Sequence, residues 1–436
     1  MSKLHCFLEH GDYMALDLGG TNFRVILLKL RNGQIMAEIV KYFHVPEEIQ
    51  LGPGHNLFDF LAECIKEFMT EHEILDKTFP LGFCFSFPMD HISLRAATLT
   101  SWTKSFKCSG VVGEEVVQML NDALADKGIS VDRASAPSSQ RPRAQIEHGI
   151  IVGVVKQLEG SAAHFDGQVL QRTLISGAQT DQKCAIGLIL GTGSNACYIE
   201  RTDRIPKWEG DHEEQEVIID IEWGAFGDNG VLDFLKTDYD RDVDAHSVNP
   251  SIFTFEKYFS GKFLGEVVRY ILVALTREGL LFNGHGSEKL FKPNTFGTAN
   301  ISKIEDQSYS GSFRDTLEGT AILNLEHILE DLSISFDNED ADIIQYVCAI
   351  VSDRAARLIS SCLANLINRM EKPTPSIAVD GSLYKYHPRL RFLMEYYMQR
   401  MTRPDIKFKF IQAEDGSGKG AGLMAAIARR LEATTK

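Results

Sequence analysis

Two glutamates and one asparagine occupy polar positions inside apolar, glycine-rich stretches of this chain. Glu222 stands in IEWGAFGDNG, Glu256 in VNPSIFTFEKYFSGKFLGEVV, and Asn195 in GTGSNA. A sugar presents hydroxyl groups in several directions, and carboxylates and amides are well suited to hydrogen-bond them. Thr103 and Lys104 in TSWTKSF are also residue types that can hydrogen-bond sugar hydroxyls. Each residue alone also fits an ordinary surface or capping position, so only their combination indicates a sugar site.

A glycine loop, DLGGTN (17–22), could hold phosphate near the N-terminal end of the chain. Its backbone N–H groups can approach an anion closely because glycine has no Cβ. Thr21 and Asn22 can add hydrogen bonds, and Asp17 can hold Mg²⁺ through water. A plain β-hairpin turn is the alternative interpretation of this loop.

Two other glycine-rich segments resemble nucleotide motifs only superficially. GTGSNA (191–196) has the spacing of a dinucleotide fingerprint, but it is predicted to continue as a strand, where the fingerprint opens a helix. DGSGKGAG (415–422) lacks the first glycine and the final Ser or Thr of a Walker A loop. We therefore predict a turn that leads into a helix, whose first amides could still hold a phosphate.

The bulk composition excludes several classes of protein. With 436 residues, 44% hydrophobic and 24% charged, the chain has an ordinary globular composition and is long enough for two lobes. A net charge of −15 argues against a nucleic-acid binder. The 8 cysteines form no C-x-x-C pair, the start of the chain has no apolar run of signal-peptide length, and no stretch reaches the length of a membrane span. We therefore expect a cytoplasmic protein without a membrane span.

The pattern of elements predicts an α/β fold. Strands are expected within 13–43, 81–89, 150–155, 181–201, 375–384 and 407–413, and helices at 56–72, 113–128, 229–236, 252–281, 312–331, 340–370, 388–402 and 418–433. Residues 131–149 are rich in Ser, Pro, Arg and Ala and are predicted to be irregular. The strand–glycine turn–strand unit at 181–201 mirrors residues 13–30, which indicates two lobes of related design.

Seven segments, in order along the chain, resemble the hexokinase family. They are LDLGGTNFRV (16–25), LGFCFSFP (81–88) with LTSWTKSF (99–106), LGTGSNACYIE (190–200), EWGAFGD (222–228), FEKYFSGKFLGE (255–266), AVDGSLYKYHP (378–388) and EDGSGKGAGLMAA (414–426). The resemblance covers almost all of 11–130 and 173–436 and is closest to the single-unit animal type. It implies two actin-like (ribonuclease H-like) α/β lobes around a cleft that closes on the sugar.

The resemblance also implies domain boundaries. The small lobe would be 11–172, with an atypical and irregular part at 132–172, joined by a C-terminal helix at 423–436. The larger, helix-rich lobe would be 173–420. Residues 1–10 would be the remnant of a longer N-terminal segment, whose loss we expect to lower stability.

Site residues carried over from the family fall into two groups. The hexose would contact Ser86, Thr103, Lys104, Asn195, Glu222 and Glu256. The phosphates, Mg²⁺ and nucleotide would contact Asp17, Gly19, Gly20, Thr21, Asn22, Arg24, Gly191, Thr192, Gly193, Asp380, Gly381, Ser382 and Ser417. Lys104 would assist catalysis, Mg-ATP would be the phosphoryl donor, and the chain would be a monomer.

One departure from the family concerns the general base. The family places an aspartate in an Asn-Asp-Thr turn ahead of a helix that RTLISGAQTDQKC (172–184) resembles. Aligned from that helix, Val169 and Leu170 take the aspartate and threonine places; aligned from IIVGVV, Lys156 and Gln157 replace Asn-Asp. The general-base aspartate is therefore absent, which costs on the order of 10²–10⁴ in rate.

These observations leave more than one function open. The first is transfer of the ATP γ-phosphate to the 6-hydroxyl of glucose or a related hexose, at a low rate or not at all. The alternative is a hexose- or nucleotide-binding sensor or scaffold on the same fold. An actin-like or chaperone-type ATPase ranks last, because the sugar-type segments have no role there. Asp220 and Ile221 also stand where the family usually has Asn-Thr, which adds charge beside the sugar site.

Overall fold

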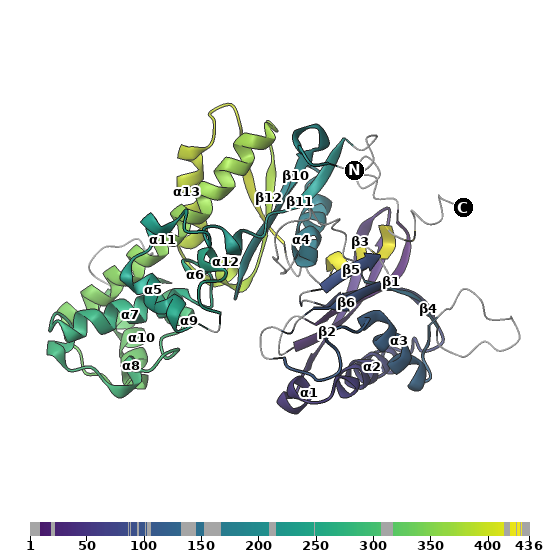
Figure 1. The fold of residues 1–436 in the computed structure, drawn as a ribbon, viewed down its shortest axis with the longest axis horizontal. Helices are drawn as coiled ribbons and strands as arrows, with labels where there is room; N and C mark the ends of the chain where they lie inside the picture. The colour runs from purple at the N-terminus through teal and green to yellow at the C-terminus, as the bar shows by residue number, and fades with distance from the viewer. Residues whose placement is uncertain are drawn as a thin grey trace, which may run out of the picture.

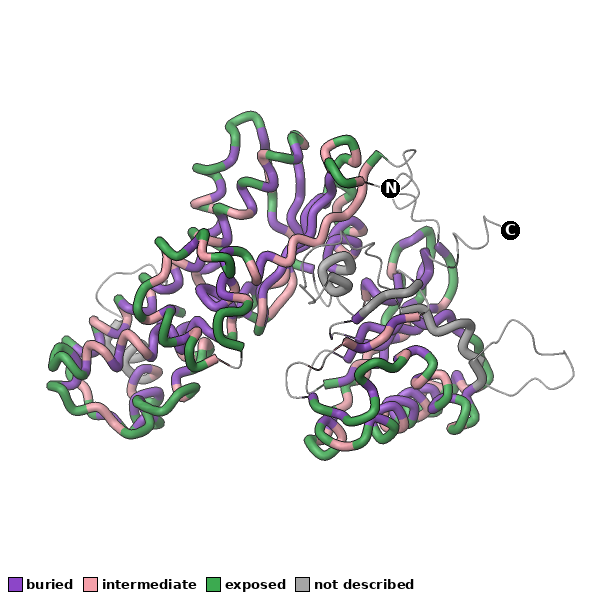
Figure 2. The backbone as a smooth tube through the Cα atoms, in the orientation of Figure 1, coloured by how far each residue is buried: buried purple, intermediate pink, exposed green. Residues whose placement is uncertain are grey.

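Two β-sheets organise the chain, each in its own body (Figure 1). The computed structural model describes residues 9–18, 22–85, 87, 89–93, 96–100, 102, 106–131, 145–151, 167–208, 215–247, 249–306, 317–413, 419–423, 425–427 and 429. In Figure 2 the buried residues gather along both sheets and along the helices that pack on them. None of the described helices is long and apolar enough to cross a membrane.

The first sheet has six strands in the order β3-β2-β1-β4-β8-β7. They are β1 (Gly11–Leu18), β2 (Asn22–Arg31), β3 (Gln34–His44), β4 (Thr78–Phe85), β7 (Ser130–Val131) and β8 (Gln145–Ile151). The first three strands pair antiparallel, and β4 pairs parallel to β1. Asn32 and Gly33, between β2 and β3, both have positive φ (50° and 69°), as an Asn-Gly hairpin turn requires.

The second sheet repeats this arrangement, with the order β11-β10-β9-β12-β13. Its strands are β9 (Cys184–Leu190), β10 (Ser194–Arg201), β11 (Glu216–Asp220), β12 (Ser376–Asp380) and β13 (Lys409–Gln412). Here too three antiparallel strands are followed by parallel ones. The mirrored strand–turn–strand units of the sequence therefore start two sheets of the same topology, and the predicted pair of actin-like α/β lobes is confirmed.

Helices α1 (Glu47–Leu51), α2 (Gly54–Glu71) and α3 (Val116–Asp126) belong to the body of the first sheet (Figure 1). The apolar residues of α2 recur at helical spacing and include Leu57, Leu61 and Phe68, all fully buried in one core with strand β4. A small hairpin of β5 (Met89–Ser93) and β6 (Ala96–Leu99) adjoins this core.

Two segments connect the bodies. Helix α4 (Gly167–Thr180) packs Leu174 into the core of the second sheet and Ile175 into a separate core on the first sheet. Helical residues near the C-terminus share that separate core, which includes Ile26 and Leu423. The contact is close, since a Cβ added at Gly82 of β4 would lie 2.3 Å from the Ala421 carbonyl oxygen.

The remaining helices belong to the second body, some of them beside its sheet and others extending away from it (Figure 1). They are α5 (Asp238–Ala245), α6 (Thr254–Lys257), α7 (Leu264–Arg277), α8 (Glu288–Phe291), α9 (Thr298–Glu305), α10 (Leu317–Asp331), α11 (Asn338–Met370), α12 (Ser382–Tyr386) and α13 (Leu390–Met401). Helix α11 is 33 residues long and starts with a capping box between Asp337 and Asp340. It runs from the helical end of the body to the second sheet (Figure 1).

Several predicted elements are wrong in extent. The single helix expected at 252–281 is broken into α6 and α7, because the chain turns at Gly261, where a Cβ would lie 2.6 Å from the Gly191 carbonyl oxygen. Within the predicted helix 229–236 only a 3-10 turn forms, at Asp233–Leu235. The predicted strand 375–384 ends at Asp380 and becomes α12. Strand β8 begins at Gln145, inside the stretch predicted to be irregular.

Candidate functional site

A tight glycine turn joins β9 to β10 and brings the predicted hexose residues together. The Gly191 N–H donates to the Gly193 carbonyl over 3.0 Å, which closes the turn at the edge of the second sheet. Ser194 and Asn195, the first residues of β10, are buried directly behind it. The Asn195 side chain therefore begins directly after the turn.

Asn195 connects two carboxylates. Its side-chain amide nitrogen donates to Glu222 Oε1 over 2.7 Å and to Asp220 Oδ1 over 3.1 Å, while its Oδ1 accepts from the Ala196 N–H over 2.8 Å. Because one amide carries only two N–H donors, each carboxylate takes one of them. The amide orientation is therefore set by the two acids.

Glu256 reaches the same place from a different element. Its Oε2 accepts the Ser194 N–H over 3.2 Å, and a Cβ added at Gly193 would lie 3.0 Å from that oxygen. A side chain at position 193 would therefore require the Glu256 carboxylate to shift slightly. The structure thus brings Asn195, Glu222 and Glu256 together, although the last two lie on separate segments of the chain.

The backbone at Glu222 is left-handed, with φ 52° and ψ 45°. This conformation is uncommon for a residue with a side chain and is held only where the surroundings fix it. Here Trp223 is buried next to it, and its indole N–H donates to Ser194 Oγ over 3.2 Å. Ser194 Oγ in turn donates to the Ile189 carbonyl over 3.0 Å, so the segment that carries Glu222 is fastened to both strands of the hairpin.

Two residues that the sequence did not single out hold the short helix α6 in place. Asp228 accepts the backbone N–H groups of Phe253 and Thr254, both at 2.9 Å, and the Thr254 hydroxyl at 2.6 Å. Lys257, only 4% exposed, donates to Asp244 Oδ1 at 2.5 Å and to two further oxygens, of Ser247 and Asn249. Glu256 is thus held from the start of its helix and from behind it.

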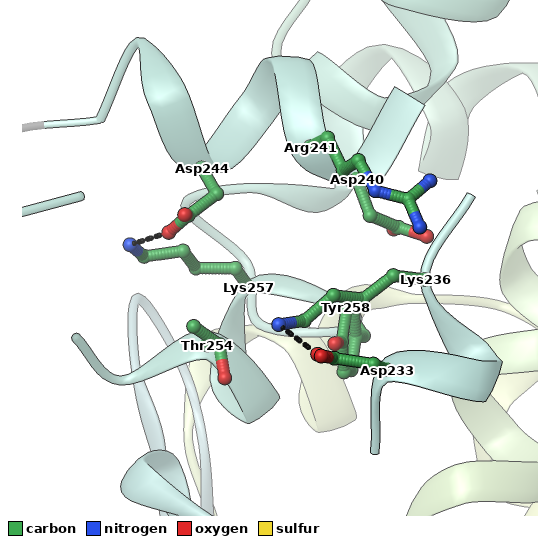
Figure 3. A pocket seen from close by; sticks show the side chains of 8 residues that line it. All are labelled: Asp233, Lys236, Asp240, Arg241, Asp244, Thr254, Lys257 and Tyr258. Atoms are coloured by element: carbon green, nitrogen blue, oxygen red, sulfur yellow. Dashed lines mark hydrogen bonds and ion pairs between the residues drawn. The ribbon is translucent and has the colours of Figure 1, made fainter. Parts of the chain in front are cut away.

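Figure 3 shows this rear side, a pocket of about 220 Å³. It is lined by Asp233, Lys236, Asp240, Arg241, Asp244, Thr254, Lys257 and Tyr258. Two lysines each pair with an aspartate: Lys257 with Asp244, and Lys236 with Asp233 at 2.6 Å. They differ in burial, because the Lys236 side chain is 23% exposed and its partner is largely solvated.

Replacing Lys257 by Met is expected to weaken hexose binding about tenfold. The change leaves Asp244 without its ammonium partner and releases the rear anchor of α6; breaking a buried pair costs roughly 3–5 kcal/mol of stability. Lys236→Met, in the same pocket, removes only an exposed pair worth about 0–1 kcal/mol and serves as control. Calorimetric titration with glucose and thermal unfolding of both variants check this. Equal effects of the two substitutions would contradict the role given to Lys257.

The predicted nucleotide residues of the second sheet lie on the other side of the same turn. A Cβ added at Gly191 would lie 3.7 Å from Gly381 Cα and 3.9 Å from Ser382 N. Gly381 has φ 117°, which favours glycine, and its own Cβ would lie 2.3 Å from the Leu190 carbonyl oxygen. Asp380 Oδ1 accepts the Gly381 N–H over 2.7 Å. Gly191, Gly381 and Ser382 therefore form one surface of adjoining backbone.

Thr192 is fixed by the turn between α6 and α7. The Lys262 N–H donates to the Thr192 carbonyl over 3.0 Å, and the Gly261 N–H donates to the Gly191 carbonyl over 2.8 Å. The glycine turn is thus clamped between the α6–α7 turn and the Gly381 segment.

Three predicted phosphate and metal residues belong to the first sheet. Asp17, at the end of β1, is buried and forms an ion pair with Arg24 across the antiparallel pair of strands. Asn22 is the first residue of β2. Asp17 and Asn22 are therefore the first and last residues of the DLGGTN loop, whose glycines lie outside the described residues.

The other predicted site residues also lie outside the described residues. These are Ser86, Thr103, Lys104, Gly19, Gly20, Thr21 and Ser417. Lys156 and Gln157 lie outside them as well, while Val169 and Leu170 fall in the first turn of α4, described by its backbone alone.

Comparisons with known proteins agree with this geometry. Two family models described as Hexokinase match residues 7–136 and 185–427. The hexokinase of Brugia malayi is 37% identical over 432 residues, which cover 97% of this chain and 68% of the relative. Human Hexokinase-1 is 39% identical over 432 residues, which cover 97% of this chain and 42% of the relative. The chain thus spans less than half the length of the human relative.

Solved structures give the same result. A hexokinase from Schistosoma mansoni complexed with glucose is 34% identical with a TM-score of 0.78, covering 96% of this chain and 86% of that one. A ROK family glucokinase from Streptomyces griseus, in complex with glucose and AMPPNP, has a TM-score of 0.50 at 13% identity over 97% of this chain and 100% of that one; it shares the fold alone. The chain belongs to the hexokinase family.

Proposed function

We propose that this chain transfers the γ-phosphoryl group of Mg-ATP to the 6-hydroxyl of glucose or a related hexose. One observation carries the proposal. The turn at 191–195 contacts a predicted hexose-binding residue on one side and predicted nucleotide-binding backbone on the other. Glu256 lies against its Gly193 end, and Gly381 lies against its Gly191 end. Phosphoryl transfer depends mainly on positioning and charge stabilisation, so two ligands held on opposite sides of one turn suit it.

In this proposal Asn195, Glu222 and Glu256 bind the hexose hydroxyls, together with Ser86, Thr103 and Lys104. Lys104 also offsets the charge that develops on the transferred phosphoryl group. The backbone at 191–193 and 380–382, with Ser417, faces the nucleotide. The DLGGTN loop, with Arg24 beside it, faces the phosphates from the first sheet.

Mg²⁺ would be held by Asp17. Magnesium in kinases is commonly held by one or two carboxylates plus the substrate phosphates, so the single buried carboxylate of this loop fits it. When bound, Mg²⁺ neutralises charge on the β- and γ-phosphates. The Arg24 guanidinium already pairs with Asp17 and keeps this carboxylate oriented at the loop.

The proposed lobes are 11–172 with the C-terminal helix 423–436, and 173–420. Helix α4, which packs against both sheets, and the C-terminal helix, which packs against the first, would be the places about which the lobes close. Closure excludes water from the bound nucleotide, so that the hexose is phosphorylated and ATP is not simply hydrolysed. The proposed setting is a monomer in the cytoplasm at the first step of glycolysis.

A coupled assay of hexose 6-phosphate formation tests the function. Neither alignment places a carboxylate at the general-base position. We therefore expect glucose-dependent product at a rate about 10²–10⁴ below that of the Schistosoma mansoni hexokinase assayed in parallel.

The other outcomes of the assay are distinct. A rate equal to that of the relative would show that this chain does not need the Asn-Asp-Thr turn for catalysis. Glucose binding by calorimetry with no product over long incubation would make the chain a hexose-binding protein. Failure to bind glucose at all would refute the proposed function.

A further inference from the structure

Three buried polar side chains from three separate elements meet behind the nucleotide segment. Ser352 lies in the middle of α11, Glu305 is the last residue of α9, and His387 ends α12. They are 0%, 2% and 4% exposed. The mechanism proposed above uses none of them, yet burying polar groups is unfavourable unless they are hydrogen-bonded.

The hydrogen bonds form a closed ring that begins and ends at Arg389, which donates at both ends. His387 Nδ1 accepts the backbone N–H groups of Arg389 (3.3 Å) and Leu390 (3.2 Å), so its proton must be on Nε2. Nε2 then donates to Ser352 Oγ over 3.0 Å, and the Ser352 hydroxyl donates to Glu305 Oε1. Arg389 closes the ring by donating to Glu305 Oε2 over 2.9 Å.

The imidazole in this ring is neutral. Burial, with a smaller contribution from Arg389, lowers the pKa of His387 to about 4. Its Nε2 lies 3.8 Å from Glu305 Oε1, which would make an ion pair only if the ring were protonated, and the two N–H donors at Nδ1 oppose that. Glu305 therefore has Arg389 as its cationic partner, and His387 acts as a hydrogen-bond donor to Ser352.

The ring holds one end of a short, stiff segment whose other end faces the nucleotide. Helix α12 has five residues, spanned by the bonds Lys385 N–H to Gly381 O and His387 N–H to Leu383 O, both at 3.1 Å. At its start Gly381 packs against Leu190 and Gly191. Helix α12 has only about one and a half turns and moves as a unit. We therefore expect a displacement of His387 to displace Ser382 as well.

We propose that His387, through Ser352 and Glu305, is a positioning residue for the nucleotide-binding segment Asp380–Ser382. The inference rests on the proposed function, because it takes this segment as the nucleotide site. It adds a role for a buried ring that does not touch the ligand itself.

The test compares two serines of one helix. Ser352→Ala removes the central hydroxyl of the ring, whereas Ser360→Ala removes an equally buried hydroxyl of α11 that donates to the Met394 carbonyl of α13 over 3.3 Å. Calorimetric titration with AMP-PNP and, separately, with glucose should show nucleotide affinity reduced about fivefold to tenfold in Ser352→Ala. Glucose affinity should be unchanged, and Ser360→Ala should match the wild type for both ligands.

Hydrogen exchange supplies a second readout that does not depend on nucleotide binding. The amides of Lys385 and His387 should exchange about tenfold faster in Ser352→Ala than in either the wild type or Ser360→Ala. Equal nucleotide affinity in the two variants, or unchanged exchange in Ser352→Ala, would overturn the positioning role. A wild-type chain that bound no AMP-PNP would instead overturn the proposed nucleotide site, whatever the exchange rates.

Discussion

Gly381→Ala is expected to abolish measurable nucleotide binding and to lower the free energy of unfolding by more than about 3 kcal/mol. The backbone at this position has φ 117°, and the added Cβ would lie 2.3 Å from the Leu190 carbonyl oxygen and 2.7 Å from Gly191 N. These atoms are backbone of the second sheet and of its glycine turn, so they cannot move aside as a flexible side chain would. Relief requires the 380–382 segment to shift away from the turn.

Thermal unfolding and AMP-PNP titration measure this effect, with Gly279→Ala as the matched control. Gly279 also has positive φ, 73°, but a Cβ there would meet nothing within 4 Å. The control should therefore lose only about 1–2 kcal/mol of stability, the cost of a left-handed alanine, and should keep its nucleotide affinity. Similar losses in the two variants would show that the contact between Gly381 and the turn is not important.

Glu222→Gln is expected to weaken glucose binding about 100-fold. The substitution keeps the shape of the side chain and can keep the bond from Asn195, but it removes the charge that strengthens hydrogen bonds from sugar hydroxyls. Hydrogen bonds to a charged group contribute about 1.5–3 kcal/mol each, and two of them weakened together give a loss of this size. Titration calorimetry with glucose measures it.

The control for this change is Glu216→Gln, at the start of strand β11, which ends two residues before Glu222. Glu216 pairs with Lys372 over 2.7 Å on a partly exposed surface, away from the Asn195 cluster. Its loss should leave the glucose affinity within about twofold, since such pairs contribute roughly 0–1 kcal/mol to stability. If Glu222→Gln bound glucose as tightly as Glu216→Gln, Glu222 would not be a hexose ligand.

The convergence of Asn195, Glu222 and Glu256 could be predicted only through the family resemblance. Each residue type alone fitted a surface or capping position, and the distance along the chain between 195 and 256 gives no information on contact. The two mirrored strand–turn–strand units were different, because alternating apolar residues around glycine turns are a local signal. They predicted the start of both sheets, which the structure confirms.

The predictions of helices that were wrong failed because of contacts with residues distant in the sequence. Residues 252–281 have a helical pattern on both sides of Gly261, but this glycine must lie against the Gly191 carbonyl of a distant turn, and the helix breaks there. Asp228 caps the start of α6 from 26 residues before Thr254, so no capping signature precedes Thr254 in the sequence. The burial of Lys257 could not be predicted for the same reason, since no local sequence pattern indicates that a lysine is buried.

A crystal structure of the chain with glucose and AMP-PNP tests the central claim most directly. The account predicts glucose hydroxyls within hydrogen-bonding distance of Asn195, Glu222 and Glu256, and the triphosphate on the opposite side of the turn at 191–193, beside Gly381. A sugar bound away from these three side chains, or a nucleotide that leaves Gly381 uncontacted, would contradict it.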